Sequence, residues 1–528
     1  MSKSLKNISA VAIATVVSRV LGLVREICIA AVFGTSALNS AFVSAFQLPN
    51  LFRRLLGEGA LTAAFVPTMT HELEHRDRTA AFALVSKVSS LLLVVTAAVV
   101  TVAMLVSANA EALFRLVGGN VADETAQRFI LAADLAVILF PYMVFVCLAA
   151  GLSAACQVLG RFSEPAWSSV WLNVSIILSL GLGGWWAWGD TERMHLLCGG
   201  VLVGGFMQMA GPGFVLWQEG WRPIFDLRAD ARVKEIMRLM APTVIGSAIY
   251  LINMSVSRFI GLSLNDQANS LLNLATRVME LPIGIFAAAI TTVIFPLIAR
   301  HAAKSDWAKL GEDYHKGLRL VLLINIPAAV GLALLSEPIV RLLFERGEFR
   351  PADTVLMTPV LAVYALGLPF LSFTSVALRG FYALKDTSTP VQAAAISFVV
   401  NLVLSLLLMR WLSTIGLALA GNLAVLAQAW YLQAKLSARM PGLGFGPLWS
   451  SLGKIIMASA LMGVAVWAGA KGVGTLPLAG KAHDLVVVLV LIPAACAVYG
   501  ALLWVMRIEG REELRLLVNK FRGRLGAG

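Results

Sequence analysis

The chain has 528 residues, of which 59% are hydrophobic and only 14% are charged, and its mean hydropathy is +0.81. These values exclude a soluble multidomain protein, in which about a quarter of the residues are charged. The net charge of +12 indicates contact with anionic lipids or an anionic substrate, and no basic, aromatic-rich domain indicates a nucleic-acid partner. The cysteines have no paired spacing, which excludes a disulfide framework or a zinc ribbon; they are Cys28, Cys147, Cys156, Cys198 and Cys496.

Long apolar stretches separated by short polar breaks follow one another along the whole chain. Because a helix of about 20 mostly apolar residues crosses a bilayer, each stretch predicts one transmembrane span. The predicted spans are residues 8–33, 40–69, 81–107, 130–156, 166–188, 196–218, 241–262, 269–298, 317–336, 356–382, 390–410, 414–436, 450–470 and 484–506. The sequence therefore predicts an all-α polytopic membrane protein with about 14 transmembrane helices.

The distribution of Lys and Arg predicts the orientation of these spans. Basic residues are most frequent in the loops on the side of the two termini, and the C-terminal tail alone contains Arg507, Arg511, Arg515, Lys520, Arg522 and Arg524. Cytoplasmic loops are enriched in Lys and Arg, so both termini are expected in the cytoplasm. The longest charged breaks, residues 219–240 and 299–316, are expected to be helical along the membrane surface.

The two halves of the chain resemble each other. Several residues of the first half recur in the second half at nearly the same offset: Glu111 and Arg115 as Glu337 and Arg341, Pro141 as Pro369, and Asn173 as Asn401. A repeat of six spans predicts two parallel six-helix lobes around a central cavity, followed by two further helices, as in transporters that rock one lobe against the other. The predicted domains are residues 1–220, 221–440 and 441–528.

Charged residues within the predicted spans are the main indication of a functional site. An arginine facing lipid tails costs at least about 2.5 kcal/mol, so intramembrane arginines are normally placed against water, a partner or a substrate. In three spans the arginines share a polar helical face with small or acidic residues. These faces contain Thr15, Ser18, Arg19, Gly22, Arg25 and Glu26 in the first span, Asn50, Arg53, Arg54, Gly57 and Glu58 in the second, and Asn273, Arg277, Glu280 and Gly284 in the eighth. Pro49 with Asn50, and Pro282, predict a break or kink in the last two.

Two interpretations of these arginines are open. In one, Glu26, Glu58 and Glu280 neutralise them or they reach the interface, which we favour for Arg54, Lys87 and Arg258. In the other, their guanidinium groups bind phosphate oxygens in a bidentate manner, which predicts a phosphate or pyrophosphate site. We assign this second role to Arg19, Arg25, Arg53 and Arg277.

The sequence His71-Glu72-Leu73-Glu74-His75 matches the HExxH pattern of zinc proteases. It lies at the charged end of a span, with no evident third ligand and no cleft that would enclose a metal-bound water. We therefore interpret it as a solvated helix end and predict no metal site and no cofactor.

The stretches SRVLGLVRE (18–26), QLPNLFRRLLGEGALTAAFVPTM (47–69) and RVMELPIGIFAAAITTVIFP (277–296) resemble the MurJ/MviN family of lipid II flippases, members of the multidrug/oligosaccharidyl-lipid/polysaccharide exporter superfamily. The resemblance covers the whole chain. It implies a flippase, not an enzyme, that moves lipid II, an undecaprenyl-pyrophosphate-linked peptidoglycan precursor, from the cytoplasmic to the periplasmic leaflet by alternating access. It also implies the bacterial inner membrane as the location, and cell-wall synthesis proteins as candidate partners.

The resemblance places the family's cavity arginines on Arg19, Arg25, Arg53 and Arg277, and its second-span glutamate on Glu58. Asn50, Asn273 and Glu280 are expected to support them. The family usually has an acidic residue where this chain has Ser40, so a coupling role at Ser40 is open. The last two spans are expected to form an apolar groove for the lipid tail.

Other functions stay open on the residues alone. An exporter of another anionic lipid-linked glycan would use the same basic cavity. A membrane enzyme acting on lipid-linked sugars would need a catalytic carboxylate pair or a metal site, and neither is evident. Membrane potential, sodium or protons could each drive the cycle.

Overall fold

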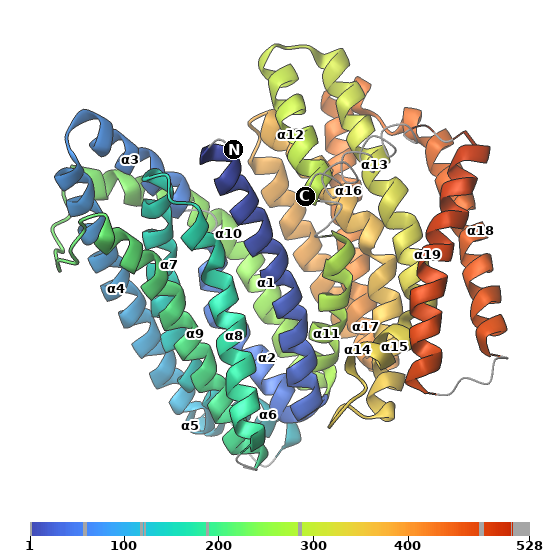
Figure 1. Ribbon diagram of the computed structural model, residues 1–528, viewed down its shortest axis with the longest axis horizontal. Coiled ribbons are helices and arrows are strands. Elements are labelled where there is room, and N and C mark those ends of the chain that lie inside the picture. The colour runs from blue at the N-terminus through green and yellow to red at the C-terminus, as the bar shows by residue number, and fades with distance from the viewer. Residues whose placement is uncertain are drawn as a thin grey trace. The chain divides into compact units, whose positions relative to one another are not determined.

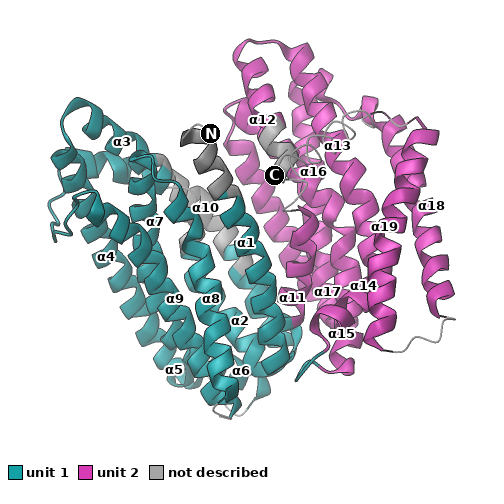
Figure 2. Ribbon diagram, viewed as in Figure 1, with its two compact units in different colours: residues 1–270, 346–349 teal, residues 271–345, 350–528 magenta. Residues whose placement is uncertain are grey.

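The computed structural model describes residues 3–55, 61–116, 120, 123–185, 189–283, 288–474, 480–507 and 509. Within these ranges the chain forms α-helices, two short 3-10 helices and connecting turns, with no β-strand, which confirms the all-α prediction (Figure 1). Contacts divide it into two compact units (Figure 2), residues 1–270 with 346–349 and residues 271–345 with 350–528. The predicted domains rest on the sequence repeat instead of on contacts, and their boundaries stay a prediction.

Unit 1 contains the first ten helices. They are α1 (Lys3–Phe33), α2 (Ala37–Leu55), α3 (Leu61–His75), α4 (Arg78–Ala108), α5 (Ala110–Leu116), α6 (Glu124–Leu139), α7 (Pro141–Val158), α8 (Ser163–Trp185), α9 (Asp190–Gln218) and α10 (Ala231–Leu264). Small residues allow close packing of α8 on α9: a Cβ added at Gly200 would lie 2.4 Å from the Ser179 hydroxyl. Close approach through small residues is a common way for membrane helices to pack without an interhelical hydrophobic driving force. This packing fixes α8, which in turn packs against α1.

Unit 2 contains most of α11 and all later helices. They are α11 (Ala268–Pro282), α12 (Ala288–Ala303), α13 (Trp307–Leu334), α14 (Ser336–Phe344), α15 (Pro351–Leu366), α16 (Leu368–Ala383), α17 (Ser388–Arg439), α18 (Trp449–Gly474) and α19 (Lys481–Val505), with 3-10 turns at Pro441–Leu443 and Gly446–Leu448. Its core is formed by buried apolar side chains of α13, α16 and α17 around Tyr314 and Phe381. A second cluster joins α13 to α18 and α19, and there Tyr499 donates a 2.8 Å hydrogen bond to the Leu323 carbonyl.

Two prolines that the sequence repeat pairs, Pro141 and Pro369, both stand at the start of a helix. Pro141 opens α7 directly after α6, and Pro369 is the second residue of α16, directly after α15. Proline lacks an amide hydrogen and so fits the first turn of a helix, where the amide has no partner within the helix. Each of the predicted spans 130–156 and 356–382 is therefore built from two consecutive helices.

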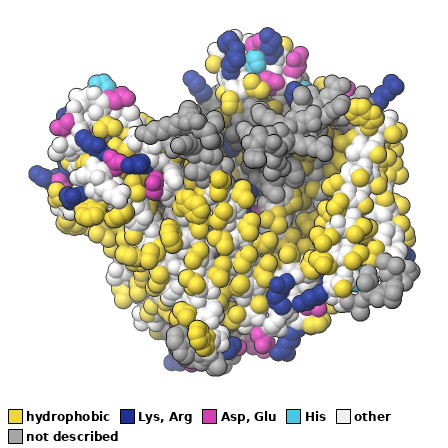
Figure 3. All heavy atoms as spheres, viewed as in Figure 1, with side chains coloured by type: hydrophobic (Ala, Val, Ile, Leu, Met, Phe, Trp, Pro, Cys, Tyr) yellow, Lys and Arg dark blue, Asp and Glu magenta, His cyan; other side chains and the backbone are white. Residues whose placement is uncertain are grey.

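Nine helical segments among the described residues are long and apolar enough to cross a membrane, so the chain is a multi-pass membrane protein. The figure of 14 spans stays a prediction. Two of the predicted spans, 390–410 and 414–436, lie within α17, whose 52 residues are interrupted at Ser413 by a non-helical backbone conformation (φ 50°, ψ −133°). The interruption falls between the two predicted spans. On the face shown in Figure 3, hydrophobic side chains cover the flanks of the helices and charged side chains gather at their ends.

The connection between α9 and α10 differs from the prediction. Residues 221–230 are not helical, and α10 begins only at Ala231, where Asp230 caps it by accepting hydrogen bonds from the amides of Arg232 and Val233. Pro223 lacks an amide hydrogen, and hydroxyl groups of α4 bond the backbone and indole of this segment, so a non-helical conformation replaces the expected helix.

Candidate functional site

Four arginines are assigned to the substrate, and Arg25 is the most deeply buried of the three whose side chains are described. Only 8% of it is exposed, and Glu26 beside it is 4% exposed. One terminal nitrogen of Arg25 lies 2.5 Å from the Glu26 carboxylate, and the other donates a 3.0 Å hydrogen bond to the Asn173 side-chain carbonyl on α8. Asn173 in turn donates to the Ser18 carbonyl at 3.1 Å. A buried arginine is tolerated only with such partners, so α1 and α8 together hold this guanidinium in place.

Arg19 lies in different surroundings from Arg25, although both were expected on one polar stripe of α1. Its side chain is exposed. Residues six positions apart on a helix with 3.6 residues per turn are rotated by about 120° relative to each other. Arg19 therefore lies at one edge of the stripe and is exposed, whereas Arg25 lies at the other edge and forms a buried cluster with Glu26 and Asn173.

The second predicted group lies on α2. Pro49 does not break the helix as expected, since α2 continues through it to Leu55, and Asn50 is half-buried. Arg53 belongs to α2, but its side chain lies outside the described residues, as does that of Arg54. Glu58 also lies outside the described residues.

The third group lies on α11, in unit 2. Arg277 donates to the Glu280 carboxylate at 3.0 Å, and Asn273 is half-buried one helical turn before Arg277. About a third of the Arg277 side chain and almost half of that of Glu280 are exposed. The helix ends at Pro282, where a kink was expected. In α1 and α11 alike, a guanidinium therefore has a glutamate of its own helix as counterion.

Ser40 is buried and contacts Ser270. Its hydroxyl lies 3.2 Å from the Ser270 amide nitrogen, from which it accepts a hydrogen bond, and 3.2 Å from the Ser270 hydroxyl. One turn further along α2, the Ser44 hydroxyl accepts a 2.7 Å hydrogen bond from the Asn269 side chain, which is completely buried. The sequence reasoning missed Asn269 and Ser44. Serines are common in apolar helices, so the sequence alone does not single out Ser44. Its importance becomes visible only from its contact with Asn269, which is far away in the sequence.

Unit 2 contains an apolar groove of about 500 Å³. It is lined by side chains of α13, α15 and α18, namely Val330, Ala333, Leu334, Leu366, Ala460, Gly463, Val464 and Trp467. The resemblance assigned a groove to the last two predicted spans. Of these, α18 contributes to this groove, whereas its remaining walls are α13 and α15 and not α19.

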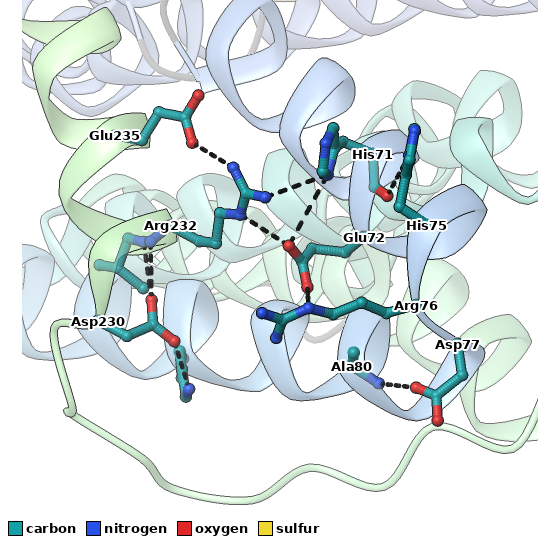
Figure 4. A network of polar contacts seen from close by, with 11 residues as sticks. His71, Glu72, His75, Arg76, Asp77, Ala80, Asp230, Arg232 and Glu235 are labelled. Carbon is teal, nitrogen blue, oxygen red and sulfur yellow. Dashed lines mark hydrogen bonds and ion pairs between the residues drawn. The ribbon is translucent and has the colours of Figure 1, made fainter.

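The HExxH-like motif forms an ion-pair network (Figure 4). Glu72 is 3% exposed, and its carboxylate accepts a 2.7 Å hydrogen bond from Arg232 of α10 and lies 3.5 Å from Arg76. Arg232 also lies 3.2 Å from Nδ1 of His71, and the rings of His71 and His75 stack at 4.2 Å. The motif thus joins α3 to the first turn of α10. Among the described residues no group of three or more His, Cys, Asp and Glu side chains has a metal-binding arrangement.

The same end of unit 1 contains a second ion-pair cluster. Glu219, directly after α9, bonds Arg161 at 2.8 Å and also bonds Arg78 at the start of α4. Hydrogen bonds from Arg161, and then from Arg78, lower the pKa of the Glu219 carboxyl. Glu219 is therefore held as a carboxylate that ties the end of α9 to α4.

The chain matches the family model described as "Lipid II flippase MurJ" over residues 29–475. The chain belongs to this family. It is 34% identical over 503 residues to "Probable lipid II flippase MurJ" of Rhizobium meliloti (strain 1021), covering 94% of this chain and 92% of the relative. It is 32% identical over 470 residues to the protein of the same description from Vibrio cholerae serotype O1 (strain ATCC 39315 / El Tor Inaba N16961), covering 86% and 87%.

Solved structures of transporters have the same fold. "Lipid II flippase MurJ, inward closed conformation" superposes with a TM-score of 0.75 at 24% identity, over 94% of this chain and 99% of that one. An inward-facing multidrug resistance MATE family transporter of the MOP superfamily superposes with a TM-score of 0.65 at 14% identity, over 80% and 95%. At these identities the likeness establishes the fold alone, and the family rests on the sequence matches.

Proposed function

We propose that the protein moves lipid II across the bacterial inner membrane, from the cytoplasmic to the periplasmic leaflet. The observation that supports this most strongly is the family match over residues 29–475. Both termini would be cytoplasmic, because the loops on their side contain most of the Lys and Arg.

The pyrophosphate of lipid II is the part of the substrate that the arginines would bind. Arg25 and Arg277 each have a glutamate partner, Glu26 and Glu280. A phosphate oxygen entering either cluster would compete with that glutamate for the guanidinium, whose fork geometry suits phosphate and carboxylate alike. Preorganised donors replace part of the hydration that the pyrophosphate loses in the membrane. Arg19 and Arg53 are the other two arginines that we assign to the pyrophosphate, and Asn50, Asn273 and Glu58 are the residues that we expect to support the four arginines.

The long prenyl tail requires an apolar surface. The groove in unit 2 is lined entirely by apolar side chains and glycine, and Trp467 gives it a large aromatic wall. We propose that part of the tail lies in this groove while the pyrophosphate is bound. An inward-negative membrane potential would favour outward movement of the anion by about 2.3 kcal/mol per charge per 100 mV.

The decisive experiment measures lipid II on the outer leaflet of cells depleted of the native protein and complemented with variants. We expect Arg19→Ala, Arg25→Ala, Arg53→Ala and Arg277→Ala to lower the externally accessible lipid II. Arg115→Ala is a matched control, because Arg115 forms an exposed ion pair with Glu111 within α5. Normal accessibility in all four variants would overturn the arginine site. Accessible lipid II that is unchanged by depletion itself would overturn the function.

A further inference from the structure

The non-helical segment after α9, residues 219–230, has no role in the flippase proposal. We call it the strap. Trp221 in the strap is 7% exposed, and its indole nitrogen donates a 2.9 Å hydrogen bond to the Ser86 hydroxyl of α4. The Asp226 amide donates to the Ser90 hydroxyl at 3.0 Å, and Lys87 lies 2.6 Å from the Asp230 carboxylate. The strap is therefore fixed along one face of α4, on residues spaced by one helical turn.

The strap turns its apolar side chains away from this attachment. Ile224 and Phe225 are each 65% exposed, and Leu227 is 48% exposed. Three large, exposed apolar side chains within four residues are unusual on a non-helical segment whose neighbouring residues Arg222, Asp226 and Arg228 are charged. Bonds to α4, including the contact of Ser90 Oγ with the Ile224 carbonyl at 3.4 Å, hold them outward.

The position of the strap along α4 indicates what covers these side chains. Ser90, which holds the strap, is the last residue before an apolar run from Leu91 to Ala108. Eighteen residues of helix span about 27 Å, close to the thickness of the hydrocarbon core of a bilayer. Along this run the exposed large side chains are apolar, beginning with Leu93, Val94 and Val95, and Thr101, which is also exposed, bonds the Ala97 carbonyl of its own helix. The strap is thus attached at the level where the lipid-facing part of α4 begins.

The residues beside the strap have the chemistry of a membrane interface. Arg222 lies over the ring of Trp217 at 5.1 Å and donates hydrogen bonds to the carbonyls of Trp217 and Trp221, while Trp217 itself is half exposed. Tryptophan is enriched at the level of lipid headgroups, where an arginine beside it can meet lipid phosphates. Non-helical backbone is excluded from the hydrocarbon core unless protein or water satisfies it, which places the strap at the boundary and not deeper.

We propose that the strap is a membrane-interface anchor: Ile224 and Phe225 insert at the boundary between headgroups and acyl chains, and Arg222 faces the phosphates of the same leaflet. The occupant of this surface is the phospholipid bilayer. Because Asp230 both ends the strap and caps α10, the anchor fixes the first turn of α10 relative to the membrane surface.

Spin labels on the full-length protein in phosphatidylglycerol and phosphatidylethanolamine vesicles test this proposal. Single cysteines replace Ile224, Phe225, Leu227 or Ala229 in a Cys28→Ala, Cys496→Ala background, since the other three cysteines are buried. Ala229 is the matched control, an exposed residue of the same strap next to Asp230. Collision with oxygen, which concentrates in the bilayer, is compared with collision with a water-soluble nickel chelate.

We expect the oxygen-to-nickel ratio at positions 224 and 225 to be severalfold higher than at position 229, with position 227 in between. Equal ratios at all four positions would overturn the anchor. Labels at 224 and 225 that neither reagent reaches would also overturn it, because protein and not lipid would then cover them. The measurement requires no translocation, so its failure would leave the lipid II proposal unaffected.

Discussion

The guanidinium of Arg25 on α1 and the side-chain carbonyl of Asn173 on α8 are joined by a 3.0 Å hydrogen bond between residues 148 positions apart. Both groups are buried. The amide of Asn173 also donates to the Ser18 carbonyl, so Asn173 contacts α1 at two points, one before and one after Arg19. Asn173 therefore orients an arginine that we assign to the substrate without itself being part of the predicted set.

Asn173→Leu is expected to lower both stability and translocation. A hydrogen bond to a buried charged group is worth about 1.5–3 kcal/mol, and leucine offers Arg25 no acceptor. The change should lower the apparent melting temperature in detergent and the amount of externally accessible lipid II. Asn401→Leu is the matched control, because Asn401 is the repeat counterpart of Asn173 on α17 and its carbonyl accepts from Ser405 at 3.4 Å. Equal loss of translocation in both variants, at equal stability, would argue against a specific role for Asn173.

The contact between Arg25 and Asn173 also shows which features of the structure the sequence could predict and which it could not. Helical periodicity and apolar length predict most of the helices, and the break at Ser413 falls where two predicted spans meet. The repeat singled out Asn173 but gave no partner for it, because the contact depends on how α8 packs against α1. Pairing across 148 residues leaves no local pattern in either segment.

The predictions that the structure contradicts also failed because of contacts between segments that are far apart in the sequence. Pro49 was expected to break its span, but α2 continues to Leu55, because a helix packed on its neighbours tolerates a proline that an isolated helix would not. The strap was expected to be helical from its charges, but its conformation is determined by Ser86 and Ser90 of another helix.

Glu72→Gln should destabilise the protein, whereas Glu74→Gln in the same motif should not. Glu72 is buried between Arg232 and Arg76, while Glu74 is exposed. Since both arginines are partly exposed, we expect a loss of about 1–3 kcal/mol, between an exposed and a fully buried ion pair. For Glu74 we expect less than about 0.5 kcal/mol, as for other surface positions. Thermal unfolding of the two purified variants in detergent provides the comparison, and similar effects would show that the network of Figure 4 contributes little.

The Glu219 ion pairs should make stability depend on acidic pH. Hydrogen bonds from Arg161 and Arg78 lower the pKa of Glu219 in the folded protein, so its contribution is complete above the pKa of an ordinary glutamate. It is lost as the pH falls through the lowered folded-state pKa, because protonation then favours the unfolded state. The melting temperature of the wild type should therefore fall more steeply with acidification than that of Glu219→Gln. Parallel curves would contradict the assignment.

Gly347→Ala should destabilise the protein more than Gly160→Ala, although both glycines have a positive φ, +60° and +75°. An alanine in this left-handed conformation costs roughly 1–2 kcal/mol at either position. At Gly160 the added Cβ would meet no atom within 4 Å, whereas at Gly347 it would lie 2.1 Å from the Ala31 carbonyl oxygen. The backbone of 346–349 must then shift, and the 2.9 Å hydrogen bond from the Glu348 amide to that carbonyl is lost.

Substitution by asparagine separates these two effects, because asparagine tolerates the left-handed conformation but still has a Cβ. Gly160→Asn should restore most of the stability that Gly160→Ala loses, whereas Gly347→Asn should be as unstable as Gly347→Ala. Hydrogen exchange of the Glu348 amide, followed together with the melting temperature, should rise in both Gly347 variants and in neither Gly160 variant. If asparagine rescues both positions equally, backbone strain and not the contact with Ala31 explains why Gly347 is a glycine.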